Sequence, residues 1–280
     1  MRQAAVIGAG TMGNGIAHVF AQQNWQVTLI DVSSQALDKA LVTIRTNLER
    51  QVKKGTLTAD ALEEILGRVA TSSDLAAVAG AEIIIEAASE KPELKFEIFA
   101  TLGRVADQGA ILASNTSSIS ITEIAARSGR AESVIGMHFM NPVPVMVLVE
   151  VIRGHATSDA TTETTMSIAS GLGKTPVEVN DYPGFVANRV LLPMINEAIY
   201  AVMEGVATPE AIDTVMKLGM AHPMGPLTLA DFIGLDVCLA ILEVMHSGLG
   251  DPKYRPCPLL RRMVAAGHLG RKSGKGFYQY

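Results

Sequence analysis

The stretch "QAAVIGAGTMGNGIAHVFAQQNWQVTLID", residues 3–31, decides the fold. It predicts a strand over residues 4–7, a glycine turn over residues 8–13, a helix over residues 11–23, and a second strand that ends on Asp31. A G-x-G-x-x-G turn alone is a weak signal. Here it follows a strand, opens a helix and has an acidic residue about twenty positions further on, which is the signature of a dinucleotide site.

The residue types of this turn fit the chemistry of such a site. Gly8 makes the tight turn, Gly10 lets the backbone approach a pyrophosphate, and Gly13 lets the helix pack closely on the strand. The helix N-terminus supplies N–H donors and partial positive charge. Asp31 would accept hydrogen bonds from ribose hydroxyls and repel a 2′-phosphate, and no arginine follows at once to receive one. The pattern therefore favours NAD over NADP, with FAD as an alternative because flavoproteins use the same turn.

Strands and helices alternate through the following part of the chain. After Asp31, apolar residues recur at helical spacing up to Gly55, and a second helix is expected over about residues 59–66, so that a helical hairpin is inserted between strands. Further strands are predicted in "RVATS" (68–72), "AEIIIEAA" (81–88), "AILASN" (110–115) and "VIGMHF" (134–139), with helices in "KPELKFEIFATLG" (91–103) and "ITEIAARSG" (121–129). This alternation predicts an α/β fold, a Rossmann-like doubly wound parallel sheet with ligands at the carboxyl ends of its strands.

The pattern becomes mostly helical near residue 184. We expect a Rossmann domain over residues 1–184 and an all-α domain over residues 185–280. The second domain should begin with a long helix over residues 185–205, in which Pro193 is a candidate bend, and should include one helical run over residues 226–248. Several of these helices are apolar on two sides and rich in Met, which is typical of a domain that buries a face against a second copy. A homodimer is therefore expected.

Composition excludes several classes of function. The chain has 280 residues, of which 48% are hydrophobic and 18% charged, so it is globular. A net charge of −5 offers no basic surface for nucleic acid. Two cysteines without His or Cys neighbours at metal spacing predict neither a disulfide framework nor a metal site, and they fit a reducing cytoplasm. The first residues lack the layout of a signal peptide, and no apolar run reaches the ~20 residues needed to cross a membrane.

A second stretch, "VIGMHFMNPVPVMVLVEVI" (134–152), holds one histidine and one carboxylate in apolar surroundings. "NPVP" turns the chain, and the following residues lead back as a strand in which Leu148 and Glu150 share one face and the valines share the other. A carboxylate among valines needs a partner, and His138 is the nearest candidate. Such a pair is a base held in one orientation, suited to removing a proton from an alcohol. The alternative is a core histidine satisfied by backbone, with Glu150 at the surface.

Five motifs together resemble the 3-hydroxyacyl-CoA dehydrogenase family, and the resemblance runs nearly end to end. They are "GAGTMGNGIA" (8–17), "SNTSSISI" (114–121), "HFMNPVPVM" with "LVEVI" (138–152), "DYPGFVANRVL" (181–191) and "GRKSGKGFY" (270–278). The resemblance is strongest to short, single-function 3-hydroxybutyryl-CoA dehydrogenases. It implies a Rossmann domain followed by a helical dimerisation domain, and reversible oxidation of L-3-hydroxyacyl-CoA to 3-ketoacyl-CoA with NAD.

The resemblance also implies roles for single residues. His138 is similar to the general base and Glu150 to its partner, while Ser117 and Asn188 match polar groups that hold the substrate hydroxyl or carbonyl. The positions that match NAD contacts are Gly8, Ala9, Gly10, Thr11, Met12, Gly13, Asp31, Glu90, Lys95, Ser117, Asn141 and Lys272. Those that match contacts to the CoA substrate are Asn47, Lys54 and Ser117.

The sequence departs from the family pattern at two positions. Val147 stands where the family commonly has Lys, and Asn47 stands where relatives often have Ser. By strand alternation Val147 faces away from Glu150, so we expect the chemistry to be preserved. Two alternatives stay open: a relative that acts on a free hydroxy acid of the gulonate or carnitine type, and an inactive NAD-binding protein on the same fold. Lys54 on the hairpin favours CoA, and the pair of His138 and Glu150 with Ser117 favours activity.

Overall fold

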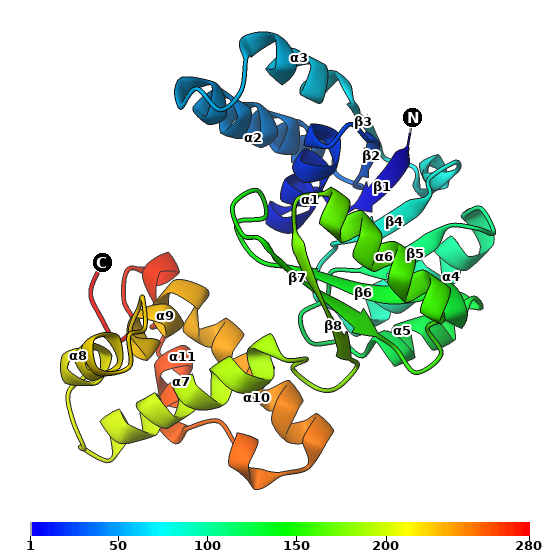
Figure 1. The fold of residues 1–280 in the computed structure, drawn as a ribbon. Coiled ribbons are helices and arrows are strands. Elements are labelled where there is room, and N and C mark those ends of the chain that lie inside the picture. The colour runs from blue at the N-terminus through cyan, green and yellow to red at the C-terminus, as the bar shows by residue number, and fades with distance from the viewer. Residues whose placement is uncertain (1) are drawn as a thin grey trace. The chain divides into compact units, whose positions relative to one another are not determined.

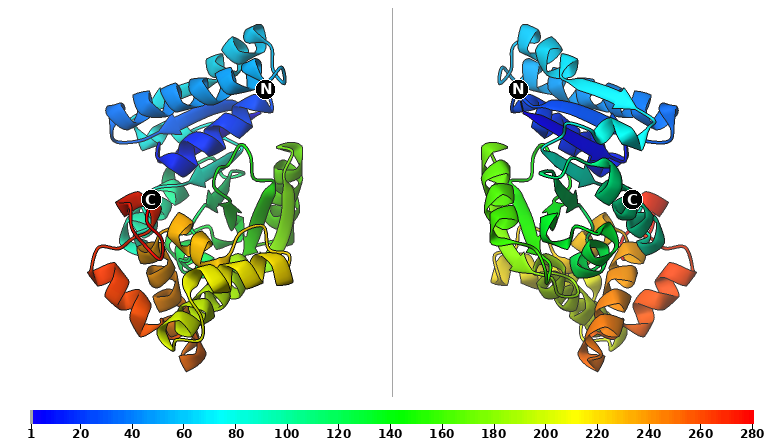
Figure 2. Two further views of the ribbon diagram at one scale, coloured as in Figure 1. Left: turned by 90° about the vertical axis from the view of Figure 1, so that its left-hand side faces the viewer. Right: turned by 90° about the vertical axis from the view of Figure 1, so that its right-hand side faces the viewer.

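The computed structural model describes residues 2–280, which form two compact units that meet between Asp181 and Tyr182 in the sequence (Figure 1). The first unit is an α/β sheet structure and the second is helical, as Figure 2 also shows. This arrangement confirms the predicted fold class.

The first unit is built on an eight-stranded sheet with the order β3-β2-β1-β4-β5-β6-β7-β8. The strands are β1 (Gln3–Ile7), β2 (Gln26–Ile30), β3 (Val69–Ser72), β4 (Ile83–Glu86), β5 (Ile111–Ser114), β6 (Val134–Phe139), β7 (Leu148–Arg153) and β8 (Thr175–Asn180). Strands β1 to β6 are parallel, whereas β7 runs antiparallel to β6 and β8 runs parallel to β7. The sheet is therefore mostly rather than wholly parallel, because the short turn after β6 can only connect antiparallel neighbours.

Helices cover both faces of this sheet (Figure 1). They are α1 (Thr11–Gln22), α2 (Ser34–Lys53), α3 (Ala59–Gly67), α4 (Pro92–Val105), α5 (Ile121–Ser128) and α6 (Asp159–Gly171). One core contains Ile16 and Phe20 of α1 together with Val149 and Val151 of β7. On the other face α5 approaches β6 so closely that a Cβ at Gly136 would come within 3.0 Å of Ile121. Alternation along β6 and β7 therefore places His138 and Glu150 on the α5 side.

The inserted helical hairpin consists of α2 and α3, beside the edge of the sheet that ends with β3 (Figure 1). Ser33 accepts a hydrogen bond from the Ala36 N–H and caps α2, and Thr58 accepts one from the Ala61 N–H and caps α3. Gly55 after α2 has a φ of +72°, a conformation that favours glycine and ends the helix. The hairpin therefore follows from local capping signals in the sequence.

The second unit contains five α-helices. They are α7 (Ala187–Met203), α8 (Pro209–Gly219), α9 (Pro226–Ile233), α10 (Leu235–Leu249) and α11 (Pro258–Ala265). Pro193 lies inside α7. The single run predicted over residues 226–248 is wrong, because Gly234 adopts a φ of +104° and separates α9 from α10. Across residues 2–280, no helix is both long and apolar enough to cross a membrane.

Candidate active site

The glycine turn between β1 and α1 has room for a ligand where the sequence requires it. A Cβ at Gly13 would lie 1.7 Å from the Gly8 carbonyl oxygen, so only glycine lets α1 pack on the turn. By contrast, a Cβ at Gly10 would meet no atom within 4 Å, so the space in front of this backbone is open. This open backbone at the N-terminus of α1 fits the pyrophosphate of a dinucleotide.

Asp31 follows the last residue of β2 and fixes the turn to the neighbouring strand. One oxygen of its carboxylate accepts a hydrogen bond of 2.8 Å from the Ala9 N–H, and the other accepts one of 2.9 Å from the Ser33 N–H. Each carboxylate oxygen can accept a further hydrogen bond. The partly exposed side chain is therefore held in place with capacity left for ribose hydroxyls.

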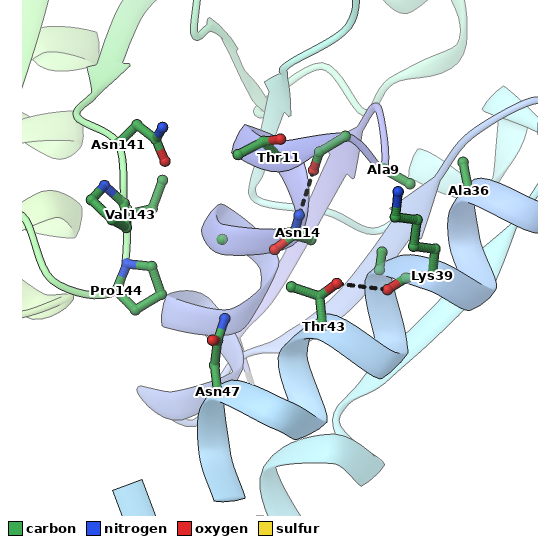
Figure 3. Close-up of a pocket in the computed structure, with 14 residues that line it drawn as sticks. Ala9, Thr11, Asn14, Ala36, Lys39, Thr43, Asn47, Asn141, Val143 and Pro144 are labelled. Atoms are coloured by element: carbon green, nitrogen blue, oxygen red, sulfur yellow. Dashed lines mark hydrogen bonds between the residues drawn. The ribbon is translucent and has the colours of Figure 1, made fainter. Parts of the chain in front are cut away.

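A cavity of about 410 Å³ lies beside this turn (Figure 3). The N-terminal part of α1 lies between two walls: α2 on one side, and the segment after β6 on the other. The side chains that line it include Thr11, Asn14, Lys39, Thr43, Asn47, Asn141, Val143 and Pro144. Asn47, which the family resemblance links to CoA, and Asn141, which it links to NAD, thus line one cavity.

His138 is the centre of a second group of polar side chains in the first unit. It lies on β6 directly opposite Glu150 on β7, and its Nδ1 is 2.8 Å from a Glu150 carboxylate oxygen. Its Nε2 is 3.1 Å from the hydroxyl oxygen of Ser117, which follows β5. His138 is 7% exposed and Glu150 3% exposed, so the pair is buried. The alternative with Glu150 at the surface is not the arrangement in this structure.

The surroundings assign the protons on the imidazole ring. An ionised carboxylate only accepts hydrogen bonds, so Nδ1 carries the proton and donates to Glu150. In the neutral ring Nε2 is then the acceptor, and the Ser117 hydroxyl donates to it. Because Glu150 fixes the tautomer and the ring orientation, the lone pair of Nε2 is directed toward Ser117. Geometrically this is a base that can exchange a proton with a hydroxyl group.

A buried charged cluster supports the segment that carries Ser117. Glu86, the last residue of β4, accepts hydrogen bonds of 2.7 Å from the Lys95 ammonium and from the Ser114 hydroxyl. Lys95 also lies 3.3 Å from Glu90, whose carboxylate accepts a hydrogen bond of 2.9 Å from the Ser117 N–H. The chain of contacts therefore runs from β4 through α4 to the Ser117 backbone.

Family models match both units of the chain. Residues 3–182 match the model described as "3-hydroxyacyl-CoA dehydrogenase, NAD binding domain", and residues 184–280 match "3-hydroxyacyl-CoA dehydrogenase, C-terminal domain". The chain belongs to the 3-hydroxyacyl-CoA dehydrogenase family.

Individual relatives of this family are similar over their whole length. A protein of Bacillus subtilis (strain 168) named "Probable 3-hydroxybutyryl-CoA dehydrogenase" is 59% identical over 100% of this chain and 98% of its own. A 3-hydroxybutyryl-CoA dehydrogenase of Bradyrhizobium diazoefficiens is 54% identical over 100% of this chain and 96% of its own. The crystal structure of (S)-3-hydroxybutyryl-CoA dehydrogenase from Ralstonia eutropha has 49% identity and a TM-score of 0.98, covering 100% and 99% of the two chains.

The remaining residues that the 3-hydroxyacyl-CoA dehydrogenase family suggests lie in different places. Lys54 is exposed at the C-terminal cap of α2, at the outer end of the hairpin. Asn188 lies half-buried in the first turn of α7, in the second unit. Lys272 also belongs to the second unit, where its ammonium pairs with Asp236 of α10. Lys95 is 1% exposed and is paired with Glu86 and Glu90.

Several residues of this site in the 3-hydroxyacyl-CoA dehydrogenase chain were not predicted from its sequence. Glu86 ends the apolar strand "IIIE" just as Asp31 follows β2, and an acid at the end of a buried strand was a usable signal. Asn115 accepts a hydrogen bond from the Phe139 N–H and ties β5 to β6, a contact between distant segments that no local pattern indicates. Lys39 and Thr43 line the cavity from an ordinary amphipathic helix, so their position gave no signal.

Proposed function

We propose that this chain catalyses the reversible, NAD-dependent oxidation of L-3-hydroxyacyl-CoA to 3-ketoacyl-CoA, with 3-hydroxybutyryl-CoA as its short-chain substrate. The observation that carries the mechanism is the line of contacts from Ser117 through His138 to Glu150. These residues lie near the carboxyl ends of β5 and β6. The glycine turn follows the carboxyl end of β1 in the same sheet. Membership of the family and its named relatives support the substrate class.

The site residues divide the proton chemistry among them. His138 Nε2 takes the proton of the substrate 3-hydroxyl group. In the complex the Ser117 hydroxyl donates to the oxygen of that group instead of to Nε2, and so orients it. As Nε2 gains the proton, the ring becomes cationic, and the buried carboxylate of Glu150 stabilises it through the hydrogen bond at Nδ1. NAD, when bound, supplies the acceptor for the hydride that leaves the same carbon. In the reverse direction His138 returns the proton to the ketone oxygen.

The proposed binding residues fall into contacts for NAD and contacts for the acyl-CoA substrate. We propose that residues 8–13 and Asp31 hold the pyrophosphate and ribose of NAD, with Glu90, Lys95, Ser117, Asn141 and Lys272 as further contacts. We propose Asn47 and Lys54 as contacts for the CoA part and Asn188 as a contact for the reacting end. The cavity lined by both Asn47 and Asn141 supports this division, since it brings the proposed cofactor and substrate ends of the first unit together. We propose a functional division near residue 184, with all of the proposed NAD contacts except Lys272 in the first domain.

A homodimer formed by the second unit is also proposed. Its helices and their ends carry large apolar side chains that are more than half exposed in the single chain, namely Val190, Val215, Leu218, Met220 and Phe232. Exposed apolar area of this kind is typical of an interface. Sedimentation analysis should give about twice the mass of the chain, and a monomer at micromolar concentration would contradict the dimer.

We propose that the protein works in the cytoplasm. Both cysteines are free and buried, which fits a reducing compartment.

The decisive experiment measures NADH oxidation with acetoacetyl-CoA for the wild type and for His138→Gln. The wild type should turn over, and the variant should lose about 10²–10⁴-fold in kcat, the usual contribution of a general base. Oxidation of L-carnitine and L-gulonate, assayed in parallel with NAD, should be far slower than that of 3-hydroxybutyryl-CoA. If the wild type reduces no acyl-CoA but oxidises a free hydroxy acid, the substrate proposal is wrong. If the wild type acts on none of these substrates and only binds NADH, the chain is an inactive NAD-binding protein and the proposed activity is wrong.

A further inference from the structure

The loop of residues 140–147, called the 140–147 loop, connects β6 to β7. It forms one wall of the cavity beside the glycine turn (Figure 3). The loop rests against α1: a Cβ at Gly15 would lie 2.9 Å from the Val143 Cβ. Val143 is 2% exposed and belongs to the core that α1 helps to form. Helix α1 therefore limits how closely the loop can approach the cavity, but this contact alone does not prevent the loop from moving outward.

Lys174 holds the 140–147 loop through two hydrogen bonds. The residue lies half-buried between α6 and β8, and its backbone N–H donates to the Ala169 carbonyl at the end of α6. Its ammonium donates to the Val143 carbonyl at 2.6 Å and to the Met146 carbonyl at 2.8 Å. Among the ion pairs of residues 2–280 none includes Lys174, so its charge is directed at these two backbone oxygens.

The other backbone hydrogen bonds of the loop leave these two carbonyls to Lys174. The Pro142 carbonyl accepts from the N–H groups of Val145 and Met146, and the Val147 carbonyl accepts from the Thr175 N–H. A carbonyl that is shielded from water is destabilised when it loses its hydrogen-bond partner, and bonds from a charged donor are stronger than average. One ammonium therefore supplies the hydrogen-bond partner of two carbonyls in a turn that contains two prolines and cannot form a regular ladder.

We propose that Lys174 is a positioning residue for cofactor binding, which fixes the 140–147 loop as a wall of the ligand cavity. It touches the loop backbone rather than the reacting atoms. Without the ammonium the loop samples more conformations, and ligand binding must then order it at an entropic cost. The effect should therefore appear in affinity and KM, whereas the chemical step of the bound complex should change little. The inference rests on the proposed function only in taking Asn141, at the start of this wall, as an NAD contact.

The test compares Lys174→Met with Lys174→Arg. The first keeps the apolar stem and removes the donor, and the second keeps a charged donor. The dissociation constant of NADH, measured by its fluorescence, should rise at least about fivefold in Lys174→Met, which corresponds to about 1 kcal/mol. It should return to within about twofold of the wild type in Lys174→Arg. In acetoacetyl-CoA reduction, kcat at saturation should stay within about threefold. Lys217→Met, which removes an exposed lysine of α8, is the matched control.

A folded Lys174→Met protein that binds NADH like the wild type would overturn the proposal, and so would an equal loss in the Met and Arg variants. If Lys174→Met does not fold, Lys174→Gln replaces it, because it keeps one neutral donor, and the same fivefold criterion applies. The NADH titration needs no turnover. If the wild type fails to reduce acetoacetyl-CoA, the proposed function fails while the role of Lys174 is still decided by the titration.

Discussion

The carboxylate of Glu150 and the imidazole Nδ1 of His138 lie 2.8 Å apart on directly paired positions of two antiparallel strands. Both side chains are more than nine-tenths buried. A buried carboxylate is stable only with a partner of this kind, and the partner gains a fixed tautomer. In the proposed mechanism Glu150 acts through His138 and does not contact the substrate.

Glu150→Gln should lower kcat by about 10²-fold or more, because a neutral amide stabilises the cationic ring of His138 less than a carboxylate does. Acetoacetyl-CoA reduction is the assay, and the pH profile of kcat/KM should change with it, which a purely structural role would not cause. Glu163→Gln, on the exposed side of α6, is the matched control. A wild-type pH profile in Glu150→Gln would contradict the role assigned to this carboxylate.

Asp31→Ala should reduce the preference for NAD over NADP. The substitution removes the acceptor for ribose hydroxyls and the charge that repels a 2′-phosphate, and we expect the ratio of kcat/KM values to fall by about tenfold, or about 1.4 kcal/mol. The Ala9 and Ser33 N–H groups also lose their partner, so NAD itself should bind less tightly. Asp38→Ala, at an exposed position of α2, controls for loss of charge. An unchanged cofactor ratio would show that Asp31 does not contact the ribose.

His18 on α1 should make the stability of the protein pH-dependent. Burial is the main cause that lowers the pKa of His18 to about 4. Its hydrogen bond with Gln22 opposes this shift, and the charge of Lys174 adds a smaller lowering effect. The unfolded chain, with an ordinary histidine pKa near 6.5, therefore binds the proton more readily. The contribution to stability is complete above about pH 6.5 and is lost as the pH falls toward 4, by on the order of 3 kcal/mol.

Urea denaturation of the wild type and His18→Gln at several pH values from 4 to 7 measures this effect. Other groups titrate in both proteins, so the difference between the two free energies of unfolding isolates His18. This difference should change by on the order of 3 kcal/mol across the range. Parallel curves for the two proteins would mean that the His18 pKa is not lowered in the folded state.

The sequence predicts most of the fold because its signals are local. The glycine turn, the caps Ser33 and Thr58 and the apolar strands each act over a few residues, and the structure has the corresponding elements. Strand β8 and helix α6 were not predicted, because β8 is an exposed edge strand with a weak apolar pattern and α6 has a threonine-rich, weakly amphipathic sequence. The break at Gly234 was missed because its positive φ depends on tertiary packing.

The candidate site was predictable only in part. Positions at strand ends could be inferred from topology, which is why His138 and Ser117 could be named from the sequence. Glu150 could be named from side-chain alternation along the returning strand. Contacts that depend on the direction of a long side chain could not be inferred from the sequence. Lys174 reaches carbonyls that lie 28 and 31 residues away in sequence, and nothing in "GLGKTP" indicates its direction.

The antiparallel pairing of β6 with β7 has a consequence for how such a chain can vary. Side chains alternate between faces along a strand, so a shift of one residue in the pairing would set Val149 or Val151 opposite His138 and turn the carboxylate out of reach. Inserting or deleting a single residue in the connecting turn would do this without altering any residue of the pair. The number of residues in that turn therefore decides whether Glu150 can contact His138 at all.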